Sequence, residues 1–483
     1  MQLEQTFTST FPRLATPAQP TVPAGVRLAW VNEPLAAQLG LDATWLSGAK
    51  GLAWMTGARS DTYALAYSGY QFGQLSPVLG DGRAHLIGEL TGQGAGRVDL
   101  HLKGSGLTPF SRRGSDGKAP LAACWREAVI GEALHGLGVP TSRALAVFET
   151  GETLARRGPE PGGMALRVAD SHLRVGTFQY AQMGMDTSGR QDLVDYALGR
   201  HPVFGLEPDE LTPAERTEKL LSAVAARQVD LIAQWQGLGF VHGVLNTDNV
   251  TISGQAIDFG PCAFIDVFKR GAVYSSIDHA GRYAYVNQFP VTRWNLARFA
   301  ESIIDLLGGE PHLAIDVAND VLGSLEETYR QQHTNVFARK LGIDLEASPQ
   351  LLGATADFVD QTLDLLEAEE RDFTGFFRAL TDSTLAGGGA PRLGAWLLGL
   401  ENLRAASGTS AEHAVQLMQG ANPVYIPRNL HLDAALQAAV TGDTAPVLEL
   451  FEAVLQPYER KTHLVHLETA PPSTGNFVTY CGT

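Results

Sequence analysis

The sequence has little cysteine, no long apolar run and no excess of positive charge. Its three cysteines, Cys124, Cys262 and Cys481, are too few for a disulfide framework or a cysteine-rich metal site. Its formal net charge of −16 argues against nucleic acid or an anionic membrane as the main partner. No apolar run approaches the length of a membrane span. We therefore expect neither a nucleic-acid nor a membrane partner.

Targeting signals and metal-binding histidine patterns are also missing. The first residues, MQLEQTFTSTFPRL, lack the charged and apolar regions of a signal peptide and the arginines of a transit peptide. The scattered histidines show no metal-ligand spacing. With 483 residues, 44% of them hydrophobic and 18% charged, the chain is typical of a soluble globular protein with two or three folded units. We expect it in the reducing cytoplasm.

Residues 241–260, VHGVLNTDNVTISGQAIDFG, hold three oxygen-bearing side chains at close spacing: Asp248, Asn249 and Asp258. Short apolar runs lie on both sides of Gly254, which predicts a loop, a short β-hairpin and an acidic group at its end. A carboxamide and a carboxylate delivered in this way suit a hard cation such as Mg²⁺. The alternative is a surface hairpin whose Asp and Asn side chains make turns.

The same stretch has the spacing of a protein-kinase active site. His242 and Asn249 are seven residues apart, and Asp258 begins an Asp-Phe-Gly triplet. The position of the kinase base, however, falls on Val244, which cannot accept a proton. The nearest acid is Asp248, beside Asn249. The pattern therefore predicts a kinase-like nucleotide site without the usual kinase base.

A β-rich region is predicted before it, with strands at 84–90 and 97–103 joined by the Gly-rich turn TGQGAG. In the second strand Lys103 falls on the polar face, with Asp99 and His101. The preceding Gly80-Asp81-Gly82-Arg83 would let backbone N–H groups approach phosphate oxygens, which Arg83 could pair with. An ordinary tight turn is the alternative.

A helix is predicted from about 120 to 136, and it carries Glu127. A strand lysine followed 20 to 25 residues later by a helix glutamate is the kinase Lys–Glu pair, so Glu127 is expected to pair with Lys103. Arg167 and Arg174 are seven residues apart, two helical turns, and could lie on one helix face to hold polyphosphate. An exposed glutamate and surface arginines are the alternatives.

The remainder reads mainly as helix. A strand-like run and a short helix ending near Gly40 come first. A long helix begins at the capping box of Thr212 and Glu215 and ends at Gly237. Further helices are predicted at about 293–307, 315–332, 355–370, 373–382 and 430–455.

Several ordered motifs resemble the selenoprotein O family of protein adenylyltransferases. They are YSGYQFGQLSPVLGDGRA, HLKGSGLTPFSRRGSDGKA, SHLRVGTF, HGVLNTDN, IDFGP, DHAGRYAYVNQ, RWNLARFAE and NPVYIPRN, with a cysteine third from the end. The resemblance implies an α+β, bilobal protein-kinase-like fold. We expect an N-terminal extension (1–75), a β-rich N-lobe (76–185), a helical C-lobe (186–400) and a helical C-terminal extension and tail (401–483).

The resemblance also implies an activity: AMP transfer from ATP, bound in a flipped orientation, to Ser, Thr or Tyr hydroxyls of proteins, with pyrophosphate released. Asp248 would be the general base, and Asn249 and Asp258 the ligands of Mg²⁺ or Mn²⁺. We expect ATP and protein acceptors as partners, and a monomer. The nucleotide-binding residues would be Gly80, Gly82, Arg83, Lys103, Asp116, Gly117, Arg167, Arg174 and Asp258, with Glu127 supporting Lys103.

The chain departs from the family pattern at three places. An extra Ser115 precedes Asp116 and Gly117, and Lys118 stands where arginine is usual. Tyr70 replaces a histidine. Tyr274 occupies the position of an activation-loop cysteine that bridges to the C-terminal cysteine in other members, so Cys481 lacks that partner; Cys262 is a conceivable substitute.

Two other functions remain open from the sequence. One is an atypical protein kinase that uses Asp248 as its base. The other is a catalytically inactive ATP-binding pseudokinase scaffold. The complete set of Asp248, Asn249 and Asp258 speaks against the scaffold, because an inactive module has no need of a whole metal site.

Overall fold

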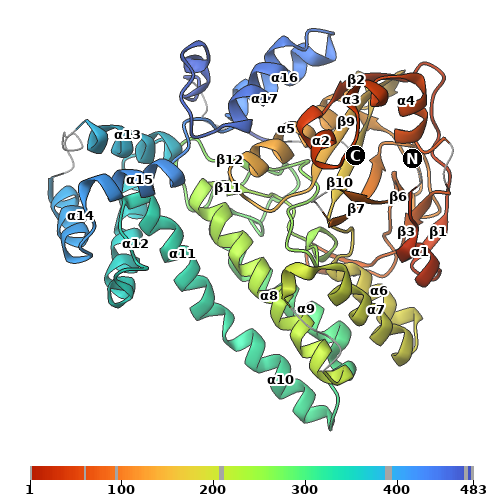
Figure 1. The fold of residues 1–483 in the computed structure, drawn as a ribbon, viewed down its shortest axis with the longest axis horizontal. Helices are drawn as coiled ribbons and strands as arrows, with labels where there is room; N and C mark the ends of the chain where they lie inside the picture. The colour runs from red at the N-terminus through yellow and green to blue at the C-terminus, as the bar shows by residue number, and fades with distance from the viewer. Residues whose placement is uncertain are drawn as a thin grey trace.

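The computed structural model describes residues 3–58, 61–92, 96–205, 211–386, 394–472 and 477–479. Within them the chain is a mixed α/β protein with one large antiparallel sheet and many helices (Figure 1), as an α+β chain should be. The sheet has the strand order β1-β3-β6-β7-β10-β9-β2, and β8 pairs with β10. Its strands are β1 (Ala15–Pro17), β2 (Arg27–Val31), β3 (Tyr63–Leu65), β6 (Ala84–Gly92), β7 (Gly96–Lys103), β8 (Ala119–Pro120), β9 (Arg143–Ala155) and β10 (Pro159–Ala169).

The two strands predicted at 84–90 and 97–103 are confirmed as β6 and β7, which pair with Glu89 opposite Asp99. The connecting turn was predicted at TGQGAG, and its residues 93–95 lie outside the described residues. Alternation in β7 places Leu100 and Leu102 in the core, but the polar face is buried as well. Lys103 is only 8% exposed. The polar side chains from Asp99 to Lys103 therefore lie inside the protein and not on its surface.

Helix α5 (Leu121–Gly136) confirms the helix predicted at 120–136 and packs against β9 and β10. Its sequence is apolar nearly all round, as expected for a helix covered on more than one side. The cover comes from α16 (Asn429–Val440) and α17 (Ala445–Leu455), which lie next to α5 in Figure 1. Phe451 of α17 stacks on Trp30 of β2 at 4.4 Å between ring centroids.

Helix α8 (Pro213–Leu238) starts at the predicted capping box, where Thr212 and Glu215 cap each other. It ends at Gly239 (φ +68°), two residues beyond the predicted stop at Gly237. α8 packs against α9 and α11, away from the sheet (Figure 1). The other helices are α1 (Thr6–Thr10), α2 (Glu33–Gln38), α3 (Ala43–Leu46), α4 (Ala49–Met55), α6 (Val175–Gly184), α7 (Thr187–Arg200), α9 (Gln288–Ile303), α10 (Pro311–Gly323), α11 (Leu325–Leu341), α12 (Leu352–Ala368), α13 (Phe373–Leu385), α14 (Gly394–Ala406) and α15 (Ala411–Ala421).

Two of the predicted helices are each divided. The helix predicted at 315–332 is α10 and α11, which separate at Ser324 after a glycine. The helix predicted at 430–455 is α16 and α17, separated by a turn in which Gly442 has a φ of +98°. Glycine weakens helix interiors and permits positive φ, so the apolar stripe alone overestimated helix length.

The hairpin predicted within residues 241–260 is wrong. The turn at Gly254 exists (φ +77°), but Thr251 bridges to Arg174 and Ala256 bridges to Thr141 instead of pairing with each other. Before the turn lie β11 (Phe240–Val241), which pairs with β12 (Ala263–Phe264), and the 3₁₀ turn η3 (Thr247–Asn249). Short runs of this kind pair with whichever edge the tertiary structure offers.

The motif NPVYIPRN fastens the C-terminal region to the chain that follows Asp258. Arg428 is 1% exposed and lies 3.0 Å from Asp266 and 2.8 Å from Asp372. The Asn429 side chain donates to the backbone carbonyl of Phe264 at 2.8 Å. Strands β1 to β3, from the first 75 residues, belong to the same sheet as β6 and β7. None of the described helices is long and apolar enough to cross a membrane.

Candidate active site

A cluster of opposite charges forms where β7, β10 and α5 meet the segment at Asp258. Lys103 Nζ lies 2.5 Å from Glu127 Oε2 and 2.6 Å from Asp258 Oδ1. Arg167 Nε lies 2.5 Å from Glu127 Oε1, and its guanidinium is 3.7 Å from Asp258 Oδ1. Strand, helix and loop thus bring together four residues that are far apart in the sequence.

The charges in this cluster hold both carboxylates ionised. Partial burial opposes ionisation of Asp258, but Lys103 and Arg167 outweigh it and lower its pKa below the usual range; Arg83 acts in the same direction. The pKa of Glu127 is lowered too, because Arg167 and Lys103 overcome the cost of burial. Three cations therefore face two carboxylates, a surplus of positive charge suited to a polyphosphate.

Asp248 in η3 has a different environment. Its Oδ1 is buried and, among the described residues, has no hydrogen-bond partner. Burial raises its pKa to about 6, Arg174 opposes this shift, and Asp258 adds to it. A Cβ added to Gly69 would lie 2.4 Å from Asp248 Oδ1, so only glycine lets the backbone pass this close. A carboxylate with one oxygen free to accept a proton and a pKa near neutrality is what a general base requires.

The prediction that Arg167 and Arg174 share a helix face is wrong. Arg167 is in β10, and Arg174 is the extended N-cap residue of α6 (φ −136°). Arg167 reaches Asp258, whereas Arg174 NH1 donates to the backbone carbonyl of Asp248 at 3.0 Å and its guanidinium lies 4.2 Å from the Tyr67 ring centroid. The strand-like MALRVA and the turn formers Asp170 and Ser171 were the signals for a strand, a turn and a helix.

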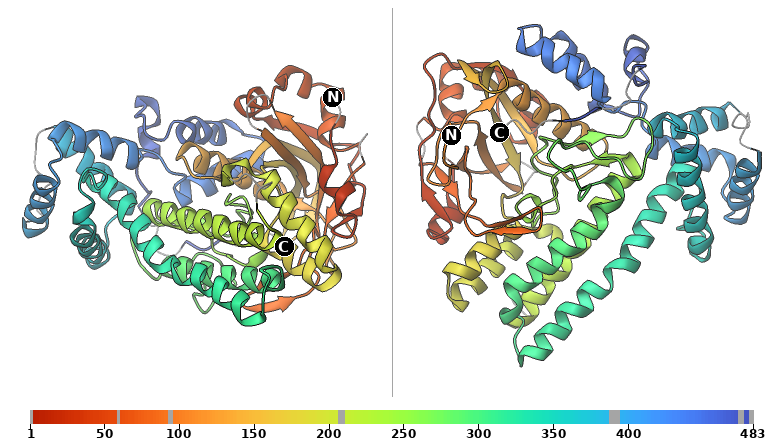
Figure 2. Two further views of the ribbon diagram at one scale, coloured as in Figure 1. Left: turned by 60° about the horizontal axis from the view of Figure 1, so that its bottom comes forward. Right: turned by 180° about the vertical axis from the view of Figure 1, so that it is seen from behind.

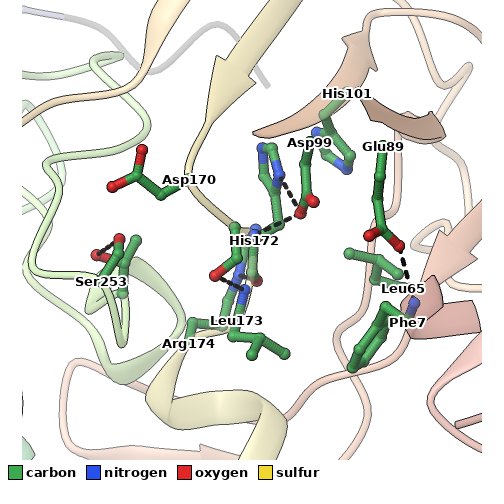
Figure 3. A network of polar contacts seen from close by, with 12 residues as sticks. Phe7, Leu65, Glu89, Asp99, His101, Asp170, His172, Leu173, Arg174 and Ser253 are labelled. Atoms are coloured by element: carbon green, nitrogen blue, oxygen red, sulfur yellow. Dashed lines mark hydrogen bonds and ion pairs between the residues drawn. The ribbon is translucent and has the colours of Figure 1, made fainter. Parts of the chain in front are cut away.

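Behind Arg174 lies a buried polar network that sequence reasoning missed (Figure 3). Asp99 accepts from the backbone N–H of His172 at 2.8 Å, and Arg174 Nε donates to the His172 carbonyl at 3.3 Å. The His172 ring stacks on His101 at 4.2 Å, and His101 Nε2 is 2.8 Å from Asp81. The network links the turn at Asp81 to Arg174. The polar face of β7 was the available signal.

The turn from Gly80 to Arg83 and the loop before β8 pack together. Gly80 (φ +60°) faces the ring of Phe110, and the carbonyl of Gly82 accepts from Ser111 Oγ at 2.5 Å. Gly117 (φ +70°) accepts from the backbone N–H of Gly106 at 3.0 Å. The carbonyl of Arg83 accepts from Gly104 N at 2.8 Å, next to Lys103. The two glycine-rich segments therefore adjoin the end of β7 that carries Lys103.

Asp116 does not join the charge cluster in this structure. Its carboxylate is 42% exposed and binds both ends of the Arg156 guanidinium, at 2.8 and 2.9 Å. It also accepts from the backbone N–H of Lys118 at 3.0 Å, which closes the turn around Gly117. The pKa of Asp116 is lowered mainly by the Arg156 hydrogen bond. The extra Ser115 lies in this same turn, where its Oγ accepts from Gly117 N.

Asn249 and Asp258 offer the oxygen atoms that a hard divalent cation takes. Asn249 Nδ2 donates to the Val244 carbonyl at 2.9 Å, which leaves its Oδ1 as an available acceptor. The Asp258 side chain is 40% exposed. The described residues contain no group of three His, Cys, Asp or Glu that could hold a metal. Two protein oxygens completed by phosphate oxygens and water is a usual Mg²⁺ arrangement, so the residues fit such an ion.

The histidine in register with the kinase motif has a structural contact. His242 Nε2 lies 2.9 Å from the carbonyl of Ile257, directly before Asp258, and burial lowers its pKa. It is neutral and joins the two halves of the 241–260 segment.

Cys124 and Cys262 are buried free thiols, and burial raises their pKa to about 12 and about 11. Cys481 lies outside the described residues. The backbone N–H of Thr479 donates to the Tyr274 carbonyl at 2.8 Å, so the last described residues run beside Tyr274.

Comparison with known proteins places this chain in a family. A family model described as protein adenylyltransferase SelO matches residues 2–455. The protein nucleotidyltransferase YdiU of Rhodococcus jostii (strain RHA1) is 45% identical over 497 residues, covering 100% of this chain and 94% of that protein. The protein of the same name from Exiguobacterium sp. (strain ATCC BAA-1283 / AT1b) is 41% identical, covering 94% of this chain and 93% of its own length. The chain belongs to the SelO family and is an enzyme of the nucleotidyltransferase class.

Proposed function

We propose that this enzyme transfers AMP from ATP to Ser, Thr or Tyr hydroxyls of proteins and releases pyrophosphate, with ATP flipped relative to its orientation in protein kinases. The observation that carries the proposal is that a proton acceptor and a cluster of cations lie near each other but on different residues. Asp248, whose buried Oδ1 has no hydrogen-bond partner among the described residues, lies near a cluster in which Lys103 and Arg167 contact Asp258. The first can accept a proton, and the second can receive phosphate charge.

In this mechanism Asp248 accepts the proton of the acceptor hydroxyl. The hydroxyl oxygen then forms a bond to the α-phosphorus, while the bond from that phosphorus to the bridging oxygen breaks and pyrophosphate takes the electron pair. Charge grows on the leaving group, and Lys103, Arg83 and Arg167 stabilise it. Arg174 holds the backbone carbonyl of Asp248 and the nucleotide phosphates together.

Asn249 and Asp258 would hold Mg²⁺ or Mn²⁺. The cation, when bound with ATP, neutralises phosphate charge and polarises the phosphoryl oxygens. Glu127 fixes the orientation of Lys103 and Arg167 by contacting both. The turn Gly80–Arg83 and the turn at Asp116 and Gly117 would approach the nucleotide through backbone N–H groups and glycine surfaces.

The architecture is proposed to be kinase-like. Residues 76–185, with β6, β7, β9, β10, α5 and α6, would form the N-lobe, and the helical residues 186–400 the C-lobe. Residues 1–75 and 401–483 would be the extensions. The pairing of a β7 lysine with an α5 glutamate supports this proposal, because that pair is the feature that defines the kinase N-lobe. We also propose that the enzyme acts as a monomer in the cytoplasm.

The test is the chemical group that an acceptor protein gains. The purified enzyme is incubated with ATP, Mg²⁺ and a generic protein acceptor, and the acceptor is analysed by intact mass and by fragmentation. The proposal predicts adenylyl groups on hydroxyl side chains, lost when Asp258 is changed to Ala. Phosphoryl groups in their place would make the enzyme a kinase. An unmodified acceptor with ATP bound would favour the scaffold.

A further inference from the structure

A short hairpin leaves the region of the main sheet and touches the loop that carries Asp248. It consists of β4 (Gly69–Gln71) and β5 (Gln74–Ser76). Beyond the close approach of Gly69 to Asp248, the backbone N–H of Tyr70 donates to Thr247 Oγ1 at 2.8 Å. In Figure 2 the hairpin is the orange ribbon that crosses toward the green segments. The hairpin is therefore one wall of the space around the proposed base.

The tip of this hairpin displays an aromatic ring on a strained backbone. Phe72 has a φ of +52° and is followed by Gly73 at +83°. Asn-Gly would fill two such positions without strain, whereas a bulky residue is disfavoured there. Phe72 is nevertheless 38% exposed. Its ring meets that of Tyr283 edge-on at 5.1 Å between centroids, and its backbone N–H donates to Asn246 Oδ1 at 3.1 Å. Strain kept at a site beside a catalytic group points to a function.

Two arginines flank the same hairpin. Arg112 NH2 donates to Gln71 Oε1 at 2.9 Å, and Arg112 is close enough to Asp248 to act on its charge. The Arg282 guanidinium lies 3.7 Å from the position of a Cβ on Gly73 and 4.9 Å from the Trp294 ring centroid. In the part of the chain that the structure describes, neither guanidinium forms an ion pair with a carboxylate. Arg282 Nε is buried without a hydrogen-bond partner among these residues, and the backbone N–H of Arg282 donates to the Asp278 carboxylate at 2.9 Å.

Arg112 and Arg282 are separate from the cations of the charge cluster around Asp258. Lys103 and Arg167 come from β7 and β10 and contact Asp258 and Glu127, whereas Arg112 and Arg282 contact the hairpin. In a chain with a net charge of −16, two guanidinium groups outside ion pairs and beside an exposed ring supply local positive charge. Such a surface complements an acidic, partly apolar ligand.

We propose that the hairpin 69–76, with Arg112 and Arg282, is the docking surface for the acceptor polypeptide. The occupant is a flexible segment of the acceptor protein that places a hydroxyl at Asp248. An apolar or aromatic side chain next to that hydroxyl packs on Phe72, and Asp or Glu side chains nearby pair with the two arginines. This inference rests on the proposed function, since it names the acceptor class for the same site.

The experiment uses the full chain, ATP labelled at the α- or the γ-phosphate, Mg²⁺ and two synthetic peptides. Both peptides contain Ser, Thr and Tyr; one has Leu and Glu beside each hydroxyl, and the other has Ala and Gln. The wild type should prefer the acidic, apolar peptide, and this preference should weaken at high salt. Phe72→Asn, which suits the positive φ and removes the ring, should raise the KM for that peptide by at least about tenfold. The KM for ATP should be unchanged.

Arg282→Gln should raise the KM for the acidic peptide and leave the KM for the neutral peptide as it was. The matched control is Arg293→Gln, a half-exposed arginine of α9 that pairs with Glu326 and should change neither. Equal use of both peptides by the wild type, or an unchanged peptide KM in Phe72→Asn, overturns the docking surface. So does a rise confined to the KM for ATP. Label transferred only from the γ-phosphate, with the same peptide preference, would refute AMP transfer and keep the surface.

Discussion

Nζ of Lys103 lies 2.6 Å from Oδ1 of Asp258, which joins the proposed phosphate-binding lysine to a proposed metal ligand. The contact explains why the pKa of Asp258 is held below its usual range, since Lys103 is its nearest cation and Arg167 adds to the effect. A group that binds metal must be ionised, and this pair keeps it so without the metal's help.

Lys103→Met should reduce AMP transfer by at least about 100-fold, because it removes a charge aimed at the leaving group. The control is Lys118→Met, whose side chain pairs with Glu152 at 2.5 Å outside the cluster and should change the rate by less than about threefold. Steady-state kinetics with labelled ATP measures both. Equal rates in the two variants would refute the phosphate role of Lys103.

Gly69→Ala should lower kcat by more than about tenfold, because its Cβ would lie 2.4 Å from Asp248 Oδ1 and 2.5 Å from Leu79 Cδ1 and would displace the base. Gly199→Ala is the matched control, since nothing lies within 4 Å of a Cβ at that helical position. Thermal unfolding shows whether each variant is folded. A folded Gly69→Ala enzyme with normal kcat would contradict the placement of Asp248.

The free energy of unfolding should fall as the pH drops below about 6.5, in part because of His201. Burial and then Arg200 lower the pKa of this histidine to about 4, so it stays neutral in the folded state. The unfolded chain takes up a proton below its ordinary value of 6.5, so the contribution of His201 is full above that pH and is lost as the pH falls toward 4.

Between pH 6.5 and pH 5 this loss amounts to about 2 kcal/mol for one histidine. Urea unfolding at the two pH values measures it. His201→Gln, which can keep the contact with Ser171, should show a pH dependence that is smaller by that amount. The same pH dependence in both proteins would mean that His201 is not buried in its neutral form.

Arg428→Met should lower the free energy of unfolding by about 3–5 kcal/mol, because buried Asp266 would lose its cation and keep only the hydrogen bond from Asn429. Arg371→Met is the control, since Arg371 is 48% exposed and pairs with Glu369 at the surface; its effect should be below about 1 kcal/mol. Urea titrations compare the two. Similar losses would show that the C-terminal clamp does not stabilise the fold.

The elements with a clear period were predictable from the sequence. β7 alternates between apolar and polar residues, and α5 and α8 carry apolar residues and stop signals, so these elements were predicted. The spacing of Lys103 and Glu127 along the chain also predicted that the two side chains pair. Spacing also singled out Asp248, Asn249 and Asp258, because these residues lie on one short segment of the chain.

Strand pairing, side-chain placement and local strain depend on tertiary contacts and could not be predicted from the sequence. Thr251 pairs with Arg174 and not with its neighbour across the turn, since a short run takes the edge that lies nearest. Arg167 is on a strand and contacts Asp258, whereas Arg174 caps a helix and binds the backbone carbonyl of Asp248. The strain at Phe72 and the isolation of Asp248 Oδ1 exist only in the folded chain.

The most direct test of the central claim compares ATP labelled at the α-phosphate with ATP labelled at the γ-phosphate. Wild-type enzyme, Mg²⁺ and a protein acceptor are used, with Asp258→Ala as the control. If the enzyme transfers AMP, the acceptor retains label from the α-phosphate alone and Asp258→Ala transfers none. Label retained from the γ-phosphate alone would contradict AMP transfer, because the attacked phosphorus would then be the one that a kinase uses.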